Sequence, residues 1–131
     1  MRILLVEDDR SLSRAVSTIL QKNNYSVDCV ENGKMALDYL EKDIYDAVIM
    51  DIMMPVMDGL TATKAIRALN RPDAGIIPII AMTANAFAED VQRCLDAGMN
   101  AHLAKPLDIE KVKKTICEHT IEIRLPQSHW L

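Results

Sequence analysis

The chain has 131 residues and 50% of them are hydrophobic, so it has the size and apolar content of one compact domain with one buried core. Its formal net charge of −4 provides no general attraction to nucleic-acid phosphates or anionic lipid, which argues against direct nucleic-acid binding and membrane binding. The cysteines Cys29, Cys94 and Cys117 are scattered without a CxxC pair, which argues against a zinc site or a disulfide framework.

From the N-terminus onward, short apolar runs alternate with longer segments in which apolar residues recur every three or four positions. Residues 3–6 predict a buried strand, residues 12–20 an amphipathic helix, residues 27–30 a second strand and residues 36–40 a shorter helix. Because carboxylates follow a short apolar run at the N-terminus, we expect neither a signal peptide nor a membrane span, and hence a cytoplasmic protein.

The second half of the chain continues this alternation. We expect strands at residues 47–50, 77–82 and 101–104. Helices are expected between them, at residues 62–69 and 87–95. Gly98 stands where a glycine commonly ends a helix, and Asp108 is placed to cap a last helix with Ile109, Val112 and Ile116 on its inner face. Strand–helix units of this kind predict an α/β fold, in which helices cover both faces of a parallel sheet.

Residues 119–131 do not continue the pattern. Ile121 and Ile123 alternate with charged residues, so a short strand, a frayed helix end and a partner-binding segment are all open. We expect Pro126 to end whichever element forms, because proline has no N–H to donate. The apolar end of the chain, Trp130 included, is suited to contact another domain or a second copy.

Polar and charged residues come at the ends of four of the expected strands. They are, in chain order, the acidic run Glu7-Asp8-Asp9, then Asp51, Thr83 and the pair Lys105-Pro106. Ligands of open parallel sheets bind at the carboxyl ends of the strands. We therefore expect these side chains to meet in one cleft.

This set of residues suits the transfer of a phosphoryl group onto a carboxylate. Asp51 offers an oxygen nucleophile of the kind that forms an aspartyl-phosphate. Mg²⁺ prefers oxygen ligands, and Asp8, Asp9 and Asp51 would be its acidic ligands. Lys105 would supply a mobile cation for one phosphoryl oxygen, and the Thr83 hydroxyl would donate a hydrogen bond to another.

Each of these residues has an ordinary structural explanation when it is taken alone. A pair of aspartates after a strand is commonly a turn and a helix cap, and a lysine is by default a solvated surface charge. Their joint occurrence at the ends of four strands is much harder to explain in this way. The combination therefore favours phosphoryl chemistry.

The same residues and the runs around them resemble the receiver domain of bacterial two-component signalling. The resemblance covers about residues 1–118 and rests on the runs ILLVEDD, VIMDIMMPVMDG, IIAMTANA and AKP. It implies a flavodoxin-like, doubly wound (βα)5 fold with a five-stranded parallel sheet in the order 2-1-3-4-5. Residues 119–131 would then be a C-terminal tail or linker.

The resemblance also implies roles for single residues. Asp51 would accept a phosphoryl group from a phosphohistidine, and the backbone carbonyl of Met53 would join the ligands of Mg²⁺, for which Mn²⁺ is a possible substitute. The bond between Lys105 and Pro106 would be cis. Such a domain is a signalling module rather than an enzyme, although it promotes its own phosphorylation and dephosphorylation.

A switch between two conformations is implied as well. Thr83 would move toward the phosphoryl group, and His102 would pack inward behind it and change the surface of the fourth helix, fifth strand and fifth helix. His102 stands where Tyr or Phe is commoner, so a plain surface histidine is an open alternative. Met53 and Asn85 would flank the route of water to the phosphoryl group and so modulate its lifetime.

The partners implied are a sensor histidine kinase or a histidine-containing phosphotransfer domain as the donor, and an output domain or partner protein outside this chain. A homodimer is open. The front half resembles receivers of DNA-binding response regulators, whereas the stretch from MTANAF to LAKPLD resembles receivers of hybrid sensor kinases. We favour a receiver from a larger protein.

Three rival functions are disfavoured. A phosphatase with an aspartyl nucleophile would need a second Asp at the position of Met53. A nucleotide-binding domain would need a GxGxxG run or a P-loop, and the sequence has neither. An interaction module without phosphorylation would not need the complete set of acceptor-site residues.

Overall fold

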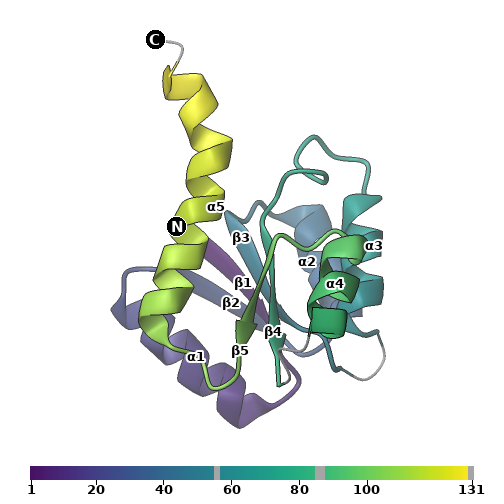
Figure 1. Cartoon of the computed structure of the whole chain (residues 1–131), viewed down its shortest axis with the longest axis vertical. Helices are drawn as coiled ribbons and strands as arrows, with labels where there is room; N and C mark the ends of the chain where they lie inside the picture. The colour runs from purple at the N-terminus through teal and green to yellow at the C-terminus, as the bar shows by residue number, and fades with distance from the viewer. Residues whose placement is uncertain (55–56, 85–87, 130–131) are drawn as a thin grey trace.

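The computed structural model describes residues 1–54, 57–84 and 88–129. Within these residues, strands and helices alternate along the whole chain (Figure 1). In chain order they are β1 (Arg2–Val6), α1 (Arg10–Lys22), β2 (Ser26–Val30), α2 (Gly33–Lys42), β3 (Ala47–Asp51), α3 (Gly59–Arg67), β4 (Ile79–Thr83), α4 (Ala88–Ala97), β5 (Ala101–Ala104) and α5 (Ile109–His129).

The strands form one parallel sheet in the order β2-β1-β3-β4-β5. Both the α/β class and this strand order confirm the prediction from the sequence. The register aligns Val6 with Met50, Asp51 with Met82, and Thr83 with Ala104. The carboxyl ends of four strands therefore lie along the same edge of the sheet.

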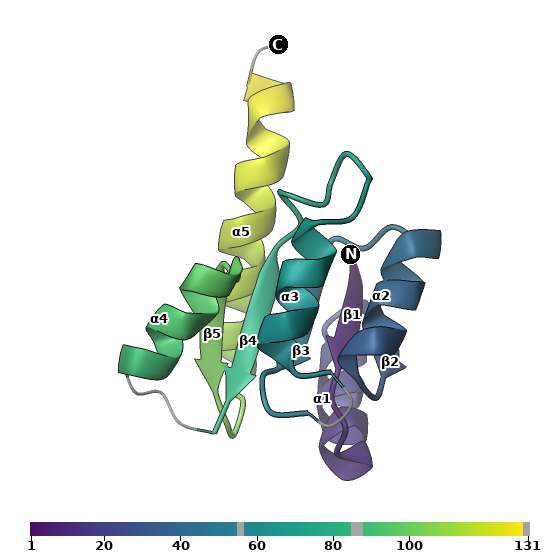
Figure 2. The same cartoon turned by 90° about the vertical axis from the view of Figure 1, so that its right-hand side faces the viewer.

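Helices cover both faces of the sheet. Figure 1 shows α1 and α5 on one face, and Figure 2 shows α2, α3 and α4 on the other. Alternate residues of β1 serve the two layers: Ile3 and Leu5 join the core cluster beneath α1 and α5, whereas Leu4 and Val6 join the one beneath α2 and α3. Burial on both sides explains why the inner strands are continuous apolar runs.

Polar side chains begin three of the helices. Asp9, Asn32 and Asp58 each accept a hydrogen bond from the backbone N–H three residues ahead, at the starts of α1, α2 and α3. Such caps satisfy N–H groups that have no partner inside the helix. They also fix the points at which the chain leaves the edge of the sheet for the helical layers.

The C-terminal segment differs from the prediction. Pro126 does not end the element, because α5 continues as a helix to His129. The proline lies in the last turn of the helix, where it has no N–H to donate to the carbonyl of Glu122, so α5 continues past it with one hydrogen bond fewer. Thr120 is buried, and beyond it the helix projects past the sheet (Figures 1 and 2). A tail boundary after residue 118 stays a prediction.

None of the helices in the described part of the chain combines the length and apolar character that crossing a bilayer requires.

A polar network connects β1, β2 and the loop before β3 at the edge of the sheet opposite the carboxyl ends of the strands. The Tyr45 hydroxyl donates a 2.6 Å hydrogen bond to Asp28. The Arg2 guanidinium lies 3.0 Å from the same carboxylate and 4.6 Å from the centroid of the Tyr45 ring. The Tyr45 side chain is buried, so its hydroxyl depends on this partner.

We expect Tyr45→Phe to lower the free energy of unfolding by about 1 kcal/mol at neutral pH, because the hydrogen bond to Asp28 is lost. This bond is the largest cause that holds the pKa of Asp28 below its ordinary value of 3.8. A depressed acid pKa contributes stability above the unfolded pKa and loses it as the pH falls through the folded pKa. The difference between the two proteins should therefore shrink at about pH 2.

Urea unfolding at both pH values measures this effect. Tyr39→Phe, on the exposed side of α2, is the matched control and should unfold like the wild type. An equal loss of stability in the two variants, or a loss at neutral pH that persists in acid, would contradict a role for the bond to Asp28.

Candidate functional site

The strand ends bring the expected polar residues together. Glu7 directly follows β1, Asp51 and Thr83 are the last residues of β3 and β4, and Lys105 directly follows β5. The backbone continues the sheet at its edge, since the Glu7 N–H donates to the Val30 carbonyl at 3.0 Å and the Lys105 N–H to that of Thr83 at 2.8 Å. Asp51 and Thr83 are almost completely buried.

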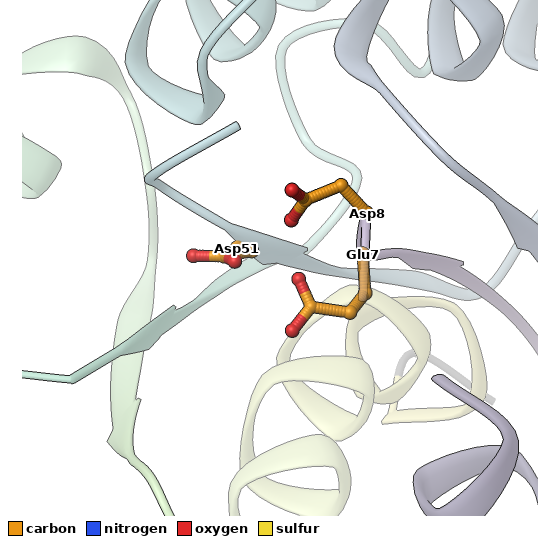
Figure 3. A group of neighbouring side chains, drawn as sticks. All are labelled: Glu7, Asp8 and Asp51. Carbon is orange, nitrogen blue, oxygen red and sulfur yellow. The ribbon is translucent and has the colours of Figure 1, made fainter. Parts of the chain in front are cut away.

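Three carboxylates form an acidic cluster. Glu7, Asp8 and Asp51 each offer an oxygen, and these atoms lie within 4.8 Å of one another (Figure 3). Figure 3 shows the Glu7 and Asp8 side chains reaching from the end of β1 toward Asp51. Asp8 is exposed, whereas Glu7 and Asp51 are buried, so the cluster is open to solvent on the side of Asp8.

Asp9, which the sequence pattern predicts as a metal ligand, does not belong to this cluster. Its carboxylate accepts the Leu12 N–H at 3.1 Å and caps α1. Glu7 takes the expected place of Asp9, because it is the first residue after the strand and its side chain turns into the cleft. The position of Asp9 three residues before the first apolar helical residue could have identified it as a cap.

Lys105 supplies positive charge to the cluster. Its ammonium lies 3.0 Å from Glu7 Oε1 and 3.1 Å from Asp51 Oδ2. Burial lowers the pKa of Lys105, but the hydrogen bonds to the two carboxylates outweigh this and raise the pKa above its usual value. The other Asp51 oxygen, Oδ1, accepts the Met53 N–H at 3.0 Å. The acceptor carboxylate is thereby held in one orientation.

Glu7 is under electrostatic strain in this arrangement. Burial, followed by the neighbouring Asp51, raises the pKa of Glu7 to about 8 even though Lys105 opposes the shift. Its second oxygen, Oε2, is buried and has no hydrogen-bond partner among the described residues. A buried carboxylate oxygen without a partner is costly, and a hard divalent cation with oxygen ligands would satisfy it. Glu7, Asp8 and Asp51 thus fit the donor set of Mg²⁺.

We expect Glu7→Gln to weaken Mg²⁺ binding by about tenfold or more, since it removes a charged oxygen ligand. Asp9→Asn is the matched control, because asparagine caps a helix equally well and Asp9 lies outside the cluster. Calorimetric titration with Mg²⁺ compares the two variants with the wild type. The opposite outcome, in which Asp9→Asn weakens Mg²⁺ binding and Glu7→Gln does not, would show that the ligands are Asp8, Asp9 and Asp51.

Thr83 faces the same region from β4. Its hydroxyl oxygen is buried and, within the described part of the chain, has no hydrogen-bond partner. Thr83 also lines a cavity of about 430 Å³ between the residues that follow β3 and those that lead to α4, with Met53 and Arg93 among the other lining residues. An unsatisfied hydroxyl beside a cavity is ready to donate to an oxygen that enters it.

The remaining candidates differ in how they are placed. Met53 is 75% exposed at the mouth of the cleft. His102 lies on β5 with its side chain exposed, so it does not pack inward in this conformation. The Lys105–Pro106 peptide bond is cis. Asn85 lies outside the described residues, and its effect on phosphoryl lifetime stays a prediction.

A glycine allows the start of α3 to approach the backbone at the end of β3. A Cβ built on Gly59 would lie 2.5 Å from the Asp51 carbonyl oxygen and 2.8 Å from Ile52 Cα. The Gly59 N–H donates to the Ile52 carbonyl at 3.2 Å, and Thr63 Oγ1 donates to the Gly59 carbonyl at 2.7 Å. The start of α3 is therefore packed directly onto the backbone of Asp51. No sequence pattern predicts this close approach of the glycine, because the contact is with backbone atoms.

Comparison with known proteins gives consistent results. The model of the response regulator receiver domain family matches residues 3–117. The sensor histidine kinase RcsC of Escherichia coli strain K12 is 36% identical over 124 residues, which cover 95% of this chain and 13% of that protein. The chain spans between 5% and 15% of the length of the curated relatives it matches.

Solved structures are similar over nearly the whole fold. The receiver domain of a sensor histidine kinase from Pseudomonas aeruginosa, solved with a magnesium ion coordinated in its active-site cleft, is 39% identical with a TM-score of 0.83, covering 91% of this chain and 96% of its own. A co-crystal structure from Saccharomyces cerevisiae pairs a histidine phosphotransfer signalling protein with the receiver domain of its downstream response regulator. Its matching chain is 25% identical with a TM-score of 0.82, covering 92% of this chain and 88% of its own.

Proposed function

We propose that this chain, which belongs to the response regulator receiver domain family, acts as a phosphorylation switch with Asp51 as its phosphoacceptor. As a member of this family it is a receiver domain of two-component phosphorelay signalling. One observation carries the assignment of Asp51: its carboxylate is buried at the end of β3, 3.1 Å from the Lys105 ammonium and within the acidic cluster that Glu7 and Asp8 complete.

The proposed reaction transfers a phosphoryl group from a phosphohistidine to Asp51. An Asp51 carboxylate oxygen forms a bond to phosphorus as the bond between phosphorus and the imidazole nitrogen breaks, and the electron pair of that bond leaves with the imidazole. Lys105, which lies 3.1 Å from Asp51, and the Thr83 hydroxyl would donate hydrogen bonds to phosphoryl oxygens. The contribution of the protein is positioning and charge, which is what such transfers require.

Glu7, Asp8 and Asp51 would hold Mg²⁺, with the backbone carbonyl of Met53 as a further ligand and Mn²⁺ as a possible substitute. The ion, when bound, supplies positive charge that neutralises the carboxylates and the incoming phosphoryl group. Burial, and after it the neighbouring Asp51, raises the pKa of Glu7, and the positive charge of a bound ion would oppose both effects. We exclude Asp9 from this set, since its carboxylate caps α1.

We further propose that phosphorylation acts on the rest of the molecule through Thr83. Its hydroxyl, which has no partner among the described residues, would move toward the phosphoryl group, and His102 would leave its exposed position and turn inward on β5. Phosphorylation adds a charge of about −1.5 to −2 at the cleft, which is enough to bias a pre-existing equilibrium. The surface of α4, β5 and α5 would then change and alter the binding of an output domain or partner.

The donor would be a histidine-containing phosphotransfer domain or a sensor histidine kinase, and the chain itself would belong to a larger protein that acts in the cytoplasm.

An apolar groove of about 190 Å³ lies between α1 and the start of α5, lined by Ile19, Leu107 and other aliphatic residues. Leu107 follows Lys105 closely in the chain, so the groove borders the acceptor cleft. A donor helix seated there would bring its phosphohistidine to Asp51.

We expect Ile19→Glu to slow phosphoryl transfer from a phosphotransfer domain by about tenfold or more, because a charge would enter the groove. Phosphorylation by acetyl phosphate should be unchanged, since this small donor needs no groove. The control is Ile44→Glu, because Ile44 is 73% exposed and lies near the opposite edge of the sheet. Equal slowing with both donors would argue against docking at this groove.

The direct test of the proposed function is incubation with Mg²⁺ and acetyl phosphate. Intact-mass spectrometry should detect the addition of one phosphoryl group, and chelation of the metal should prevent it. Repeated hydrolysis of phosphate esters without a phosphorylated protein would instead support a phosphatase. A protein that takes up no phosphoryl group under any of these conditions would support an interaction module.

A further inference from the structure

Arg67 joins three segments that are distant in the sequence. It lies at the C-terminal end of α3, and its guanidinium donates five hydrogen bonds of 2.8 to 3.1 Å. The acceptors are the Gly98 carbonyl, which takes two of them, the carbonyls of Ala74 and Ile77, and the Asn100 side-chain oxygen. We call this set of residues the Arg67 clamp.

The clamp uses the full capacity of the guanidinium. An arginine side chain carries five N–H groups in a fixed planar fork, and each of those of Arg67 has an acceptor. Asn100 extends the network, because the same side-chain oxygen accepts the Ile79 N–H at 2.9 Å while the Asn100 N–H donates to the Ile79 carbonyl at 2.8 Å. The first residue of β4 is thus fixed to the segment that follows α4.

The end of α4 is shaped to fit this arginine. The N–H groups of Gly98 and Met99 donate back to the carbonyls of Leu95 and Cys94, which is the pattern that closes a helix at a glycine. Gly98 has a φ of 110°, and a Cβ built there would lie 3.1 Å from Arg67 Cγ. Only glycine combines this backbone conformation with such close approach, so the helix end and the arginine form one fitted unit.

The other end of α4 is connected to the acceptor site. β4 ends at Thr83 and α4 begins at Ala88, so the N-terminal end of the helix follows Thr83 closely in the sequence. The C-terminal end of α4 is bound to α3 by the clamp, whereas the N-terminal end follows the residue whose hydroxyl has no hydrogen-bond partner in the described part of the chain.

We propose that Arg67 is a positioning residue that makes the C-terminal end of α4 a fixed pivot, so that the response to phosphorylation is confined to the N-terminal end of this helix. The proposal rests on the proposed phosphoacceptor function of Asp51. A fixed pivot converts a small displacement at Thr83 into a rotation of α4 rather than a translation of the whole helix. The partner surface would then change most near residues 88–92 and least near Gly98.

The first experiment examines the clamp in the unmodified protein by amide hydrogen exchange. Arg67→Lys leaves a charge but cannot reach all five acceptors, so the Met99, Asn100 and Ile79 amides should exchange about tenfold faster, with little change in α1. Asn100→Asp keeps the acceptor and adds an opposite charge 2.8 Å from Arg67, so exchange there should slow. Arg2→Lys, which weakens an arginine network at another part of the sheet, is the control.

The second experiment adds Mg²⁺ and beryllofluoride as a phosphoryl mimic. In the wild type, exchange should change severalfold at residues 88–92 and by less than about twofold at Met99 and Asn100, whereas in Arg67→Lys the change should reach both ends. An equal response at both ends of wild-type α4 overturns the pivot. The pivot is also overturned if amide exchange in Arg67→Lys rises uniformly along the chain and to the same extent as in Arg2→Lys. If the wild type binds no mimic at Asp51, the phosphoacceptor function fails, and the anchoring role of Arg67 is decided by the first experiment.

Discussion

Asp51→Asn should abolish the addition of a phosphoryl group by acetyl phosphate and Mg²⁺, reducing it from stoichiometric to undetectable by intact-mass spectrometry. The amide keeps the shape of the carboxylate, but it is a poor nucleophile and loses the negative charge that faces Lys105 and the metal ligands. The fold should be retained, because the substitution removes the repulsion that Asp51 exerts on buried Glu7. The midpoint of thermal unfolding should therefore stay equal or rise.

Asp58→Asn is the matched control for this substitution. Asp58 is another carboxylate close to the cleft, but it caps α3 by accepting the Thr61 N–H at 2.8 Å and does not belong to the acidic cluster. Asparagine caps helices as well as aspartate does, so phosphorylation should persist in this variant. A phosphoryl group that remains on Asp51→Asn and disappears from Asp58→Asn would place the acceptor elsewhere and refute the proposed function.

The strand ends were predictable because a parallel sheet imposes a strong constraint. Once the apolar runs were read as strands, Asp51, Thr83 and Lys105 had to lie at one edge, and the order β2-β1-β3-β4-β5 brings them side by side. Which acid of the run after β1 joins them was not predictable from that constraint. Glu7 and Asp9 differ through a local competition, in which the start of α1 takes the Asp9 carboxylate as its cap.

Other features depend on contacts that a sequence pattern does not encode. The partners of Arg67 are mostly backbone carbonyls, which every residue carries, so no spacing of residue types indicates the clamp. The end of α5 was predicted wrongly for a related reason. Pro126 leaves the carbonyl of Glu122 without its helical N–H partner, but the loss of this one hydrogen bond does not stop the helix from reaching His129.

Gly59→Ala should produce the second large effect, because it changes the backbone that carries the acceptor. The added methyl group would lie 2.5 Å from the Asp51 carbonyl oxygen and 2.8 Å from Ile52 Cα, and neither backbone atom can yield by a change of rotamer. We expect a loss of about 1–3 kcal/mol in unfolding free energy. Displacement of Asp51 by even about 1 Å should slow phosphorylation by about a hundredfold. Urea unfolding and the rate of phosphorylation by acetyl phosphate measure the two effects.

Two other glycines separate displacement of Asp51 from loss of stability. A Cβ on Gly33 would lie 2.7 Å from Ala62 Cβ and 2.9 Å from the Met57 carbonyl oxygen, so Gly33→Ala strains the packing of α2 on α3 and on the loop before α3, but its nearest contacts include no atom of β3. Gly75 has open space around it, so Gly75→Ala should behave like the wild type. If Gly33→Ala is as unstable as Gly59→Ala but is phosphorylated at nearly the wild-type rate, the slow reaction of Gly59→Ala comes from the position of Asp51. Equal slowing in both variants would show instead that general loosening of the fold is sufficient, and that the close packing of Gly59 on the Asp51 backbone has no separate role in the reaction.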